Sequence, residues 1–188
     1  MYNTSTNKQV IYSLDSLSDS LYDLLRKKSF NDISITELCQ NCNITRKTFY
    51  RNCDDLYDLI DYSIDHHMTS ALENVSWYHS PTQEIVSSFF KYWEDKKDLL
   101  SLLYAKGLFP HFKTRLIKIV SNYMAYQRMT APSVKGDEAL REYYDSFLFG
   151  GFLQMMEAWI VHNYALSAEE ISEVYMIFKQ EDLTGKRI

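Results

Sequence analysis

The first stretch of the chain carries apolar residues at helical spacing. Successive members of this stripe are separated by four, three, four and three positions, which places them on one face of an α-helix. Basic residues follow at 26–28, where positive charge stabilises the negative end of a helix dipole. The pattern predicts one amphipathic helix that ends near Lys28. Its apolar stripe consists of Val10, Leu14, Leu17, Leu21 and Leu24.

Two helix starts follow in close succession within the segment 35–52. Ser34 and Glu37 fit a capping box, in which each side chain satisfies a backbone amide at the start of a helix. Thr45 fits the cap of a second helix soon afterwards. Between the two, Asn43 suits a turn because asparagine tolerates the left-handed backbone conformation. Two short helices joined by so few residues are typical of a helix-turn-helix.

The second helix of this motif would present basic and hydroxyl side chains. Arg46, Lys47 and Thr48 stand at its N-terminal end, where a recognition helix places the side chains that read base edges in the major groove. Residues one turn further on would hold phosphate oxygens, a contact that positions the protein without reading sequence. The residues expected at the DNA are Thr36, Thr45, Arg46, Lys47, Thr48, Tyr50, Arg51 and Asn52.

Four short sequence motifs accompany these helices in a fixed order. They are Phe30, Leu38-Cys39, Cys42-Asn43-Ile44-Thr45 and Thr48-Phe49-Tyr50. Through them, residues 8–62 resemble the N-terminal domain of the TetR family of bacterial transcriptional regulators, whose consensus has corresponding motifs in the same register. The resemblance implies that the first helix packs across the helix-turn-helix. It also implies that a helix over 55–72 links this domain to the rest of the chain.

The charge around the motif departs from the family pattern. Residues 1–53 hold seven Lys or Arg against five acids, while the whole chain carries a net charge of −5. Leu56 stands where the family commonly has a lysine that touches phosphate. Asp54 fits the cap of the next helix, but acidic side chains beside a phosphate backbone weaken DNA binding. An acidic cluster without a basic residue follows the motif, at Asp54, Asp55, Asp58, Asp61 and Asp65.

Helical signals continue in the second part of the chain. Ser80 with Gln83 and Ser167 with Glu170 fit two further capping boxes, and Gly107 is suited to end a helix. Helices are predicted over 81–94, 95–106, 110–127, 137–163 and 168–181, with a loop over 130–136. The chain is therefore predicted to be all-α, with about nine helices. A DNA-binding domain over 1–74 would precede a helical bundle over 75–188 for ligand binding and dimerisation.

The C-terminal bundle holds most of the aromatic residues. In TetR-like proteins the corresponding bundle often encloses an effector pocket, and aromatic and methionine walls suit a small apolar ligand. The same residues at helical spacing would equally fill an ordinary core, so both readings stay open. The candidate pocket residues are Phe89, Trp93, Tyr104, Phe112, Met124, Phe147 and Met155.

The resemblance also implies a homodimer, formed by the last two helices of each subunit. Gly150 and Gly151 each cost about 1 kcal/mol in a helix interior, so a close helix approach or a kink is expected there. A twofold dimer would place two recognition helices about 34 Å apart and would require a palindromic operator. The expected interface comprises Tyr144, Phe147, Leu148, Gly151, Phe152, Met155, Trp159, Ile171, Val174, Tyr175 and Phe178.

Composition and cysteine usage narrow the remaining function classes. The longest apolar stretch, 147–161, is interrupted by polar residues and falls short of the ~20 residues that span a bilayer, so a cytoplasmic protein without a membrane partner is expected. Cys39 and Cys42 form a CxxC, but His66 and His67 would lie on another helix, so no four-ligand zinc site results. We expect these cysteines in the core, no metal and no cofactor. No catalytic constellation indicates an enzyme.

Two hypotheses follow from these patterns. The first is a TetR-like regulator, a repressor, that binds a palindromic DNA operator as a homodimer and is released by a small-molecule effector. The alternative is a coregulator of the same fold that acts through protein contacts and has little DNA affinity of its own. Leu56 and the acidic cluster motivate the alternative.

Overall fold

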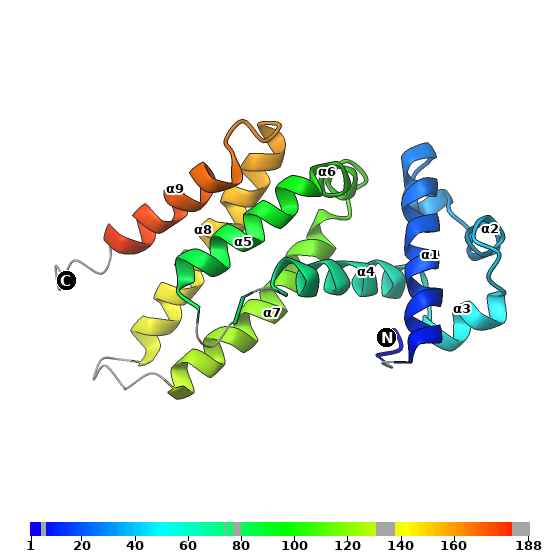
Figure 1. Cartoon of the computed structure of the whole chain (residues 1–188), viewed down its shortest axis with the longest axis horizontal. Helices are drawn as coiled ribbons and strands as arrows, with labels where there is room; N and C mark the ends of the chain where they lie inside the picture. Colours follow the sequence, from blue (N-terminus) through cyan, green and yellow to red (C-terminus); the bar gives the residue numbers. More distant parts are fainter. Residues whose placement is uncertain (5–6, 74, 77–79, 131–137, 182–188) are drawn as a thin grey trace. The chain divides into compact units, whose positions relative to one another are not determined.

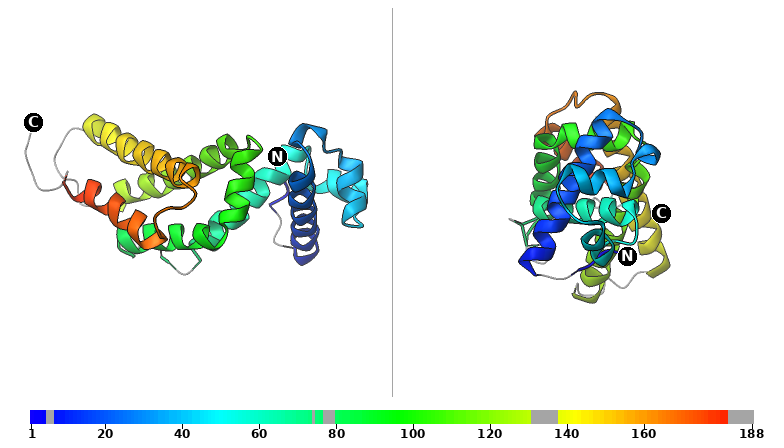
Figure 2. Two further views of the ribbon diagram at one scale, coloured as in Figure 1. Left: turned by 90° about the horizontal axis from the view of Figure 1, so that it is seen from above. Right: turned by 90° about the vertical axis from the view of Figure 1, so that its right-hand side faces the viewer.

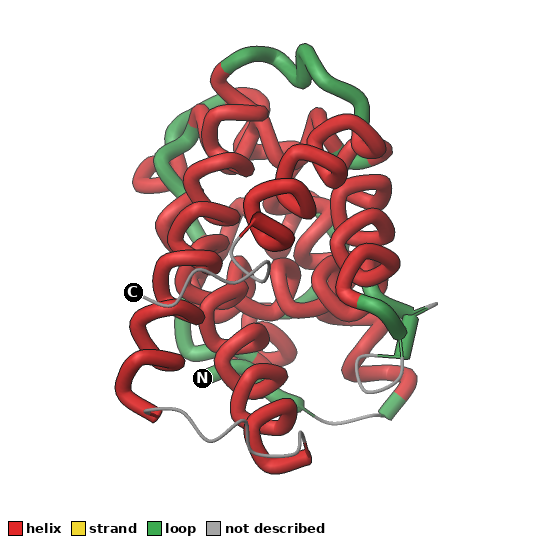
Figure 3. The backbone as a smooth tube through the Cα atoms, turned by 90° about the vertical axis from the view of Figure 1, so that its left-hand side faces the viewer, coloured by secondary structure: helices red, strands yellow, loops and turns green. Residues whose placement is uncertain are grey.

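The computed structural model describes residues 1–4, 7–73, 75–76, 80–130 and 138–181. Over these residues the chain is all-α, as predicted, and no strand occurs among them (Figures 1 and 3). A short 3-10 helix, η1 (Phe30–Asp32), follows the first helix. The nine α-helices of this described part are α1 (Lys8–Lys27), α2 (Ile35–Asn41), α3 (Arg46–Asn52), α4 (Leu56–Ala71), α5 (Thr82–Asp95), α6 (Lys97–Ala105), α7 (Phe109–Thr130), α8 (Glu138–Val161) and α9 (Ala168–Glu181).

The chain divides into two compact units that are not contiguous in sequence. Unit 1 contains residues 1–69 and 98–116, and unit 2 contains 70–97 and 117–188. Helix α6 and the first turns of α7 therefore belong with the helix-turn-helix. The predicted division after residue 74 follows the order of the chain, whereas the packing gathers elements from both sides of it. That domain boundary stays a prediction.

The core of unit 1 forms around the apolar stripe of α1. Leu17 and Leu21 are fully buried, and α2 and α3 both pack against this helix (Figure 2, right). Leu38 of α2 and Phe49 of α3 are the fully buried anchors of the two short helices. Burial of one such side chain stabilises a fold by about 1.5–3 kcal/mol. This packing agrees with the prediction that the first helix is amphipathic and packs across the helix-turn-helix.

Backbone and side-chain hydrogen bonds fix the helix-turn-helix. The Ser34 hydroxyl accepts from the Glu37 amide at 3.2 Å, and the Glu37 carboxylate accepts from the Lys28 ammonium. Only one arm of the predicted capping box therefore forms, because Lys28 offers the carboxylate a charged partner. The Thr45 hydroxyl accepts from the Thr48 amide at 3.2 Å and caps α3 as predicted.

The turn between α2 and α3 depends on Asn43. Its φ angle is +55°, in the left-handed region. The Asn43 amide donates to the Gln40 carbonyl at 3.3 Å, and the Ile44 amide donates to the Cys39 carbonyl at 3.0 Å. This pair of bonds is a Schellman motif, which satisfies the carbonyl groups left over at the end of a helix. Asn43 thus adopts the left-handed conformation for which a glycine is common at the end of a helix.

Unit 2 is organised around aromatic side chains of α5. This helix packs along α9 (Figures 1 and 2). The Phe90 ring lies 5.2 Å from the Phe152 ring and 5.3 Å from the Trp159 ring of α8, measured between centroids. Tyr175 of α9 meets Phe152 edge-on at 5.3 Å. These contacts bring α5, α8 and α9 into one aromatic core.

Helix ends in the second half confirm two sequence signals and correct a third. Gly107 has a φ angle of +71° and ends α6 in a Schellman motif. The Ser167 amide donates to the Glu170 carboxylate at 2.8 Å and the Glu170 amide to the Ser167 hydroxyl at 3.2 Å, which completes the predicted box. The predicted capping box of Ser80 with Gln83 is wrong. Its hydroxyl accepts from the Ser76 amide, and Pro81 precedes α5 without a side-chain cap.

We predict opposite effects for two substitutions at Asn43. Asn43→Ala should lower the free energy of unfolding by about 1 kcal/mol, because alanine lacks the local hydrogen bonding that lets asparagine adopt the left-handed region. Asn43→Gly should keep or raise stability. Urea unfolding measures both, with the exposed Gln40→Ala as a control. Equal stability of the alanine and glycine variants would contradict a structural requirement for a positive φ angle here.

Candidate nucleic-acid interface

Helix α3 presents a polar, basic surface away from its buried anchor. Six of the eight residues expected at the DNA are exposed, and Thr48 is half-buried. The Thr45 and Thr48 hydroxyls lie 3.0 Å apart and support each other at the start of the helix. Because Phe49 buries one face of α3, these residues are left exposed to solvent. They are Thr36 on α2, Thr45 before α3, and Arg46, Lys47, Tyr50 and Arg51 on α3.

Arg46 and Tyr50 interact on this exposed face. The guanidinium carbon lies 5.8 Å from the centre of the Tyr50 ring, within the range of a cation–π contact. The Tyr50 ring in turn meets Phe49 edge-on at 5.4 Å. The Tyr50 ring therefore contacts both the buried Phe49 and the Arg46 guanidinium, and it restricts where the guanidinium can lie.

Asn52 does not belong to the exposed surface, which corrects the sequence prediction. Its side chain is buried. The amide nitrogen donates to the Thr48 carbonyl at 3.0 Å, and the amide oxygen accepts from the Asn3 side chain at 3.1 Å. A side chain with both polar ends satisfied inside the protein is not available to a phosphate. Sequence position alone could not reveal this, because the partner lies 49 residues away.

The acidic cluster that follows the motif is engaged with partners inside unit 1. The Asp55 carboxylate caps α4 by accepting from the Asp58 amide at 2.9 Å. Asp54, which the sequence suggested as the cap, instead lies 2.5 Å from the α-ammonium of Met1. That ammonium also lies 2.7 Å from Asp58. The Asp54 and Asp58 carboxylates raise the pKa of the Met1 amino group to about 10.

Arg115 of α7 forms ion pairs with the two remaining aspartates. Its Nε donates to Asp65 at 2.7 Å and an Nη atom contacts the same carboxylate, so the pair is bidentate. A second Nη atom lies 3.5 Å from Asp61. His111 Nδ1 lies 3.6 Å from Asp61, and its ring stacks on Tyr57 at 4.8 Å. Four of the five acids therefore have a positively charged partner, which corrects the expectation that the whole cluster is unpaired, and Asp55 serves as a helix cap.

Residues 2 and 3 pack against this region and form an element that the sequence did not predict. We call Tyr2 and Asn3 the N-terminal strap. The Asn3 amide donates to the Asn52 carbonyl at 2.7 Å. The Tyr2 hydroxyl donates to Asp65, and its ring meets Tyr62 edge-on at 5.5 Å. Burial, followed by the bond to Asp65, raises the pKa of Tyr2, so its hydroxyl stays protonated.

The cysteines were expected in the core, and two of the three are buried. Cys39 and Cys53 are buried, Cys42 is half-buried, and all three are free. Burial raises the pKa of the Cys53 thiol to about 12 and also raises that of Cys39, which disfavours the thiolate that a metal requires. Among the described residues, no group of three or more His, Cys, Asp or Glu side chains is placed to hold a metal ion.

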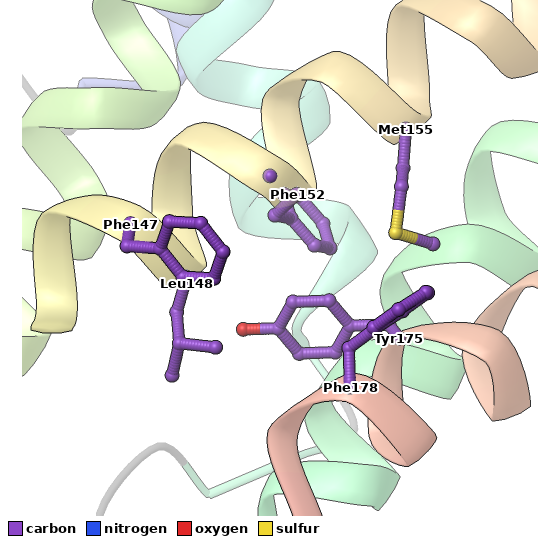
Figure 4. Close-up of a pocket in the computed structure, with 7 residues that line it drawn as sticks. Phe147, Leu148, Phe152, Met155, Tyr175 and Phe178 are labelled. Atoms are coloured by element: carbon purple, nitrogen blue, oxygen red, sulfur yellow. The ribbon is translucent and has the colours of Figure 1, made fainter. Parts of the chain in front are cut away.

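A groove on unit 2 collects residues from α8 and α9. Its volume is about 450 Å³, and Figure 4 shows its aromatic and methionine walls. Phe147 and Phe178 are exposed at its edges, by 75% and 61%. Every lining residue belongs to the set expected at the dimer interface. The groove is lined by Phe147, Leu148, Gly151, Phe152, Met155, Tyr175 and Phe178.

Other members of the expected dimer set are placed differently. Trp159 and Ile171 are buried inside unit 2, and the Trp159 indole donates to the Leu166 carbonyl at 2.8 Å. They belong to the core rather than to a free surface, which corrects the prediction for them. Val174 is half-buried. The side chain of Tyr144 lies outside the described residues.

The residues expected to line an effector pocket are divided between the two units. Tyr104 and Phe112 belong to unit 1, whereas Phe89, Trp93, Phe147 and Met155 belong to unit 2. Phe89, Trp93 and Phe112 are buried as ordinary core residues. The side chain of Met124 lies outside the described residues. Three of the expected pocket residues therefore lie in the core, whereas Phe147 and Met155 line the groove on unit 2, and an effector pocket stays a prediction.

None of the helices in the described part of the chain is long and apolar enough to cross a bilayer.

One family model and two solved structures match this chain. The TetR C-terminal model described as "Transcriptional regulator C-terminal region" matches residues 81–179, more than half of the chain. A structure described as the dihydroxyacetone kinase operon activator DhaS has a TM-score of 0.66 at 13% identity, over 92% of this chain and 96% of that one. A TetR transcriptional regulator from Streptococcus agalactiae 2603V has a TM-score of 0.63 at 15% identity, with the same coverages.

At these identities the two structures show a shared fold. No curated protein matches the chain. The helix-turn-helix held by α1, the all-helical bundle and the match over residues 81–179 agree with one another. The chain belongs to the TetR family of transcriptional regulators.

Proposed function

We propose that this protein is a DNA-binding repressor that occupies a palindromic operator as a homodimer. The observation that carries this proposal is the exposed basic face of α3, which is held in place by the buried Phe49. A helix presented in this way fits the major groove, where side chains at its start reach base edges. Arg46 and Lys47 are the expected base readers.

The side chains of α3 divide into two roles in this proposal. Arg46 is held over the Tyr50 ring, and a guanidinium with restricted freedom is suited to two hydrogen bonds with one guanine. Arg51 is exposed one turn further along the helix, where it can neutralise a phosphate. Base contacts provide sequence preference, and phosphate contacts provide position and much of the affinity.

The paired carboxylates favour DNA binding over the coregulator alternative. That alternative drew on the acidic cluster, whose repulsion of phosphate would weaken binding. Asp61 and Asp65 share one guanidinium, and Asp54 and Asp58 lie beside an ammonium group. Each pair therefore presents less negative charge than its sequence implies. Leu56 remains half-buried where the family often has a lysine, so phosphate contact should depend on other residues.

A second copy of the chain is the proposed occupant of the groove on unit 2. Large exposed aromatic side chains such as Phe147 and Phe178 mark surfaces that bury against a partner. Gly151 lines the groove, and a Cβ atom added there would meet nothing within 4 Å among the described residues. No close approach within this part of the chain accounts for the glycine, whereas the backbone of a second helix would. A twofold pairing of this surface implies a palindromic operator.

Release by a small molecule completes the proposal. An effector lowers operator occupancy only if it binds the DNA-free state more tightly than the DNA-bound state. The sign of regulation is a separate question, since one of the similar structures is described as an operon activator. A promoter reporter carrying the recovered operator distinguishes the two signs: loss of the protein raises expression for a repressor and lowers it for an activator.

We predict that Arg46→Ala combined with Lys47→Ala weakens operator binding by at least about tenfold, because each lost base contact costs about 1–3 kcal/mol. The operator is first recovered from a random DNA pool, and affinities are then measured by fluorescence anisotropy at fixed salt. Lys96→Ala with Lys97→Ala is the control, because it removes the same charge from an exposed pair in unit 2. Undiminished binding by the α3 variant, or no binding by the parent protein at low salt, would refute the proposal.

A different signature is expected for Arg51→Ala. Loss of one phosphate contact should weaken operator and scrambled DNA alike and reduce the slope of log affinity against log salt by about one. The measurement is a salt titration with both DNAs. A loss confined to the operator would instead assign Arg51 to base readout.

The dimer prediction concerns the edge of the groove. Phe147→Glu should convert the dimer to a monomer at micromolar concentration, because a carboxylate would be buried without a partner. Sedimentation velocity gives the oligomeric state. Tyr12→Glu, at an aromatic residue of similar exposure on α1, is the matched control. A parent protein that is already monomeric, or a Phe147→Glu variant that still dimerises, would exclude this surface.

A further inference from the structure

We propose that Tyr2 and Asn3 are positioning residues for DNA recognition, which hold the C-terminal end of α3 in the orientation that sequence readout requires. The inference rests on the proposed function and extends it to residues outside the helix-turn-helix. It draws on contacts of the N-terminal strap with α3, α4 and α7, all within unit 1.

Asn3 makes a two-point contact with the last residue of the recognition helix. Its backbone amide donates to the Asn52 carbonyl at 2.7 Å, and its side-chain amide donates to the Asn52 side chain at 3.1 Å. The last carbonyl groups of any helix lack partners within that helix. Asn3 therefore supplies a hydrogen-bond donor to the last carbonyl of α3. The buried Asn52 side chain in turn donates to the Thr48 carbonyl one turn back.

Tyr2 anchors the strap to α4. Its ring packs edge-on against Tyr62 of α4, and its hydroxyl donates to Asp65 of the same helix. The guanidinium of Arg115 on α7 lies 5.9 Å from the centre of the ring and is also bonded to Asp65. The adjacent residues Tyr2 and Asn3 thus connect α3 with an ion pair between α4 and α7.

The shortness of α3 explains why such support matters. The helix spans seven residues, 46–52, so it has about two turns and little stability of its own. Its start is fixed by the Thr45 cap and its middle by Phe49. Without the strap, its far end would be fixed mainly by the chain that continues into α4. Side chains that read bases must be held within about 0.5 Å of their working position, so a loose end would degrade readout.

The consequence is specific to sequence readout. Phosphate contacts tolerate small shifts of a helix because charge attraction has little directionality, whereas base contacts need aligned donors and acceptors. Loss of the strap should therefore weaken binding to the operator and leave binding to unrelated DNA almost unchanged. A general loss of folded protein would reduce both to the same extent.

The test compares a strap variant with a matched surface variant. Tyr2→Phe combined with Asn3→Ala removes the hydroxyl and side-chain amide contacts, whereas Tyr12→Phe with Asn31→Ala makes the same chemical changes at exposed positions. Affinities are measured for the recovered operator and for scrambled DNA of the same length, beside a thermal unfolding curve. The strap variant should lose about tenfold in operator affinity, with scrambled-DNA affinity unchanged. Asn3→Gln, which keeps both donors, should retain most of the affinity.

Three results would overturn the inference, and they are distinguishable. A parent protein that does not discriminate operator from scrambled DNA would remove the proposed function and this inference with it. A parent protein that discriminates, alongside a strap variant that discriminates equally well, would overturn the inference alone. Equal losses on both DNAs accompanied by a lower unfolding temperature would show a role in stability without one in positioning.

Discussion

The helix-turn-helix depends on the apolar side chains that its two short helices bury where they pack against α1 and each other. Helices of seven residues, such as α2 and α3, are too short to persist by themselves in water. Leu38 and Phe49 are fully buried, and they convert two unstable segments into fixed elements. The exposed face of α3 is a by-product of that burial, since a helix anchored on one side must present the other to solvent. Everything proposed about DNA recognition depends on this anchoring.

Local sequence signals predicted the helices well because their causes are local. The stripe on α1, the Thr45 cap and the box at Ser167 involve residues within one or two turns of each other, so spacing alone reveals them. The failure at Ser80 also has a local cause: the hydroxyl found a partner at the Ser76 amide, a competing short-range bond. A sequence motif does not show which of several neighbouring hydrogen-bond partners a side chain takes.

The candidate site was predicted only in part, because several of its determinants are distant in sequence. Charge counted along the chain showed an acidic cluster beside the recognition helix. The compensating guanidinium of Arg115 lies 50 residues from Asp65, and no periodicity connects the two. Asn52 was misjudged for the same reason, since its partner Asn3 precedes the first helix. For the aromatic residues of the second half of the chain, the sequence left an effector pocket and an ordinary core both open, because residue type and helical spacing do not distinguish a cavity from a filled core.

The interleaving of the two units also bears on how such a protein can change in evolution. Unit 1 takes residues 98–116 from beyond the chain segment that completes α5. A segment exchanged between relatives at residue 74 would carry Asp61 and Asp65 but leave Arg115 behind, and partly buried carboxylates without their guanidinium are costly. Recombination at that point would therefore select for a compatible basic residue in the recipient. At this ion pair, the segment after residue 74 and the segment before it must therefore change together.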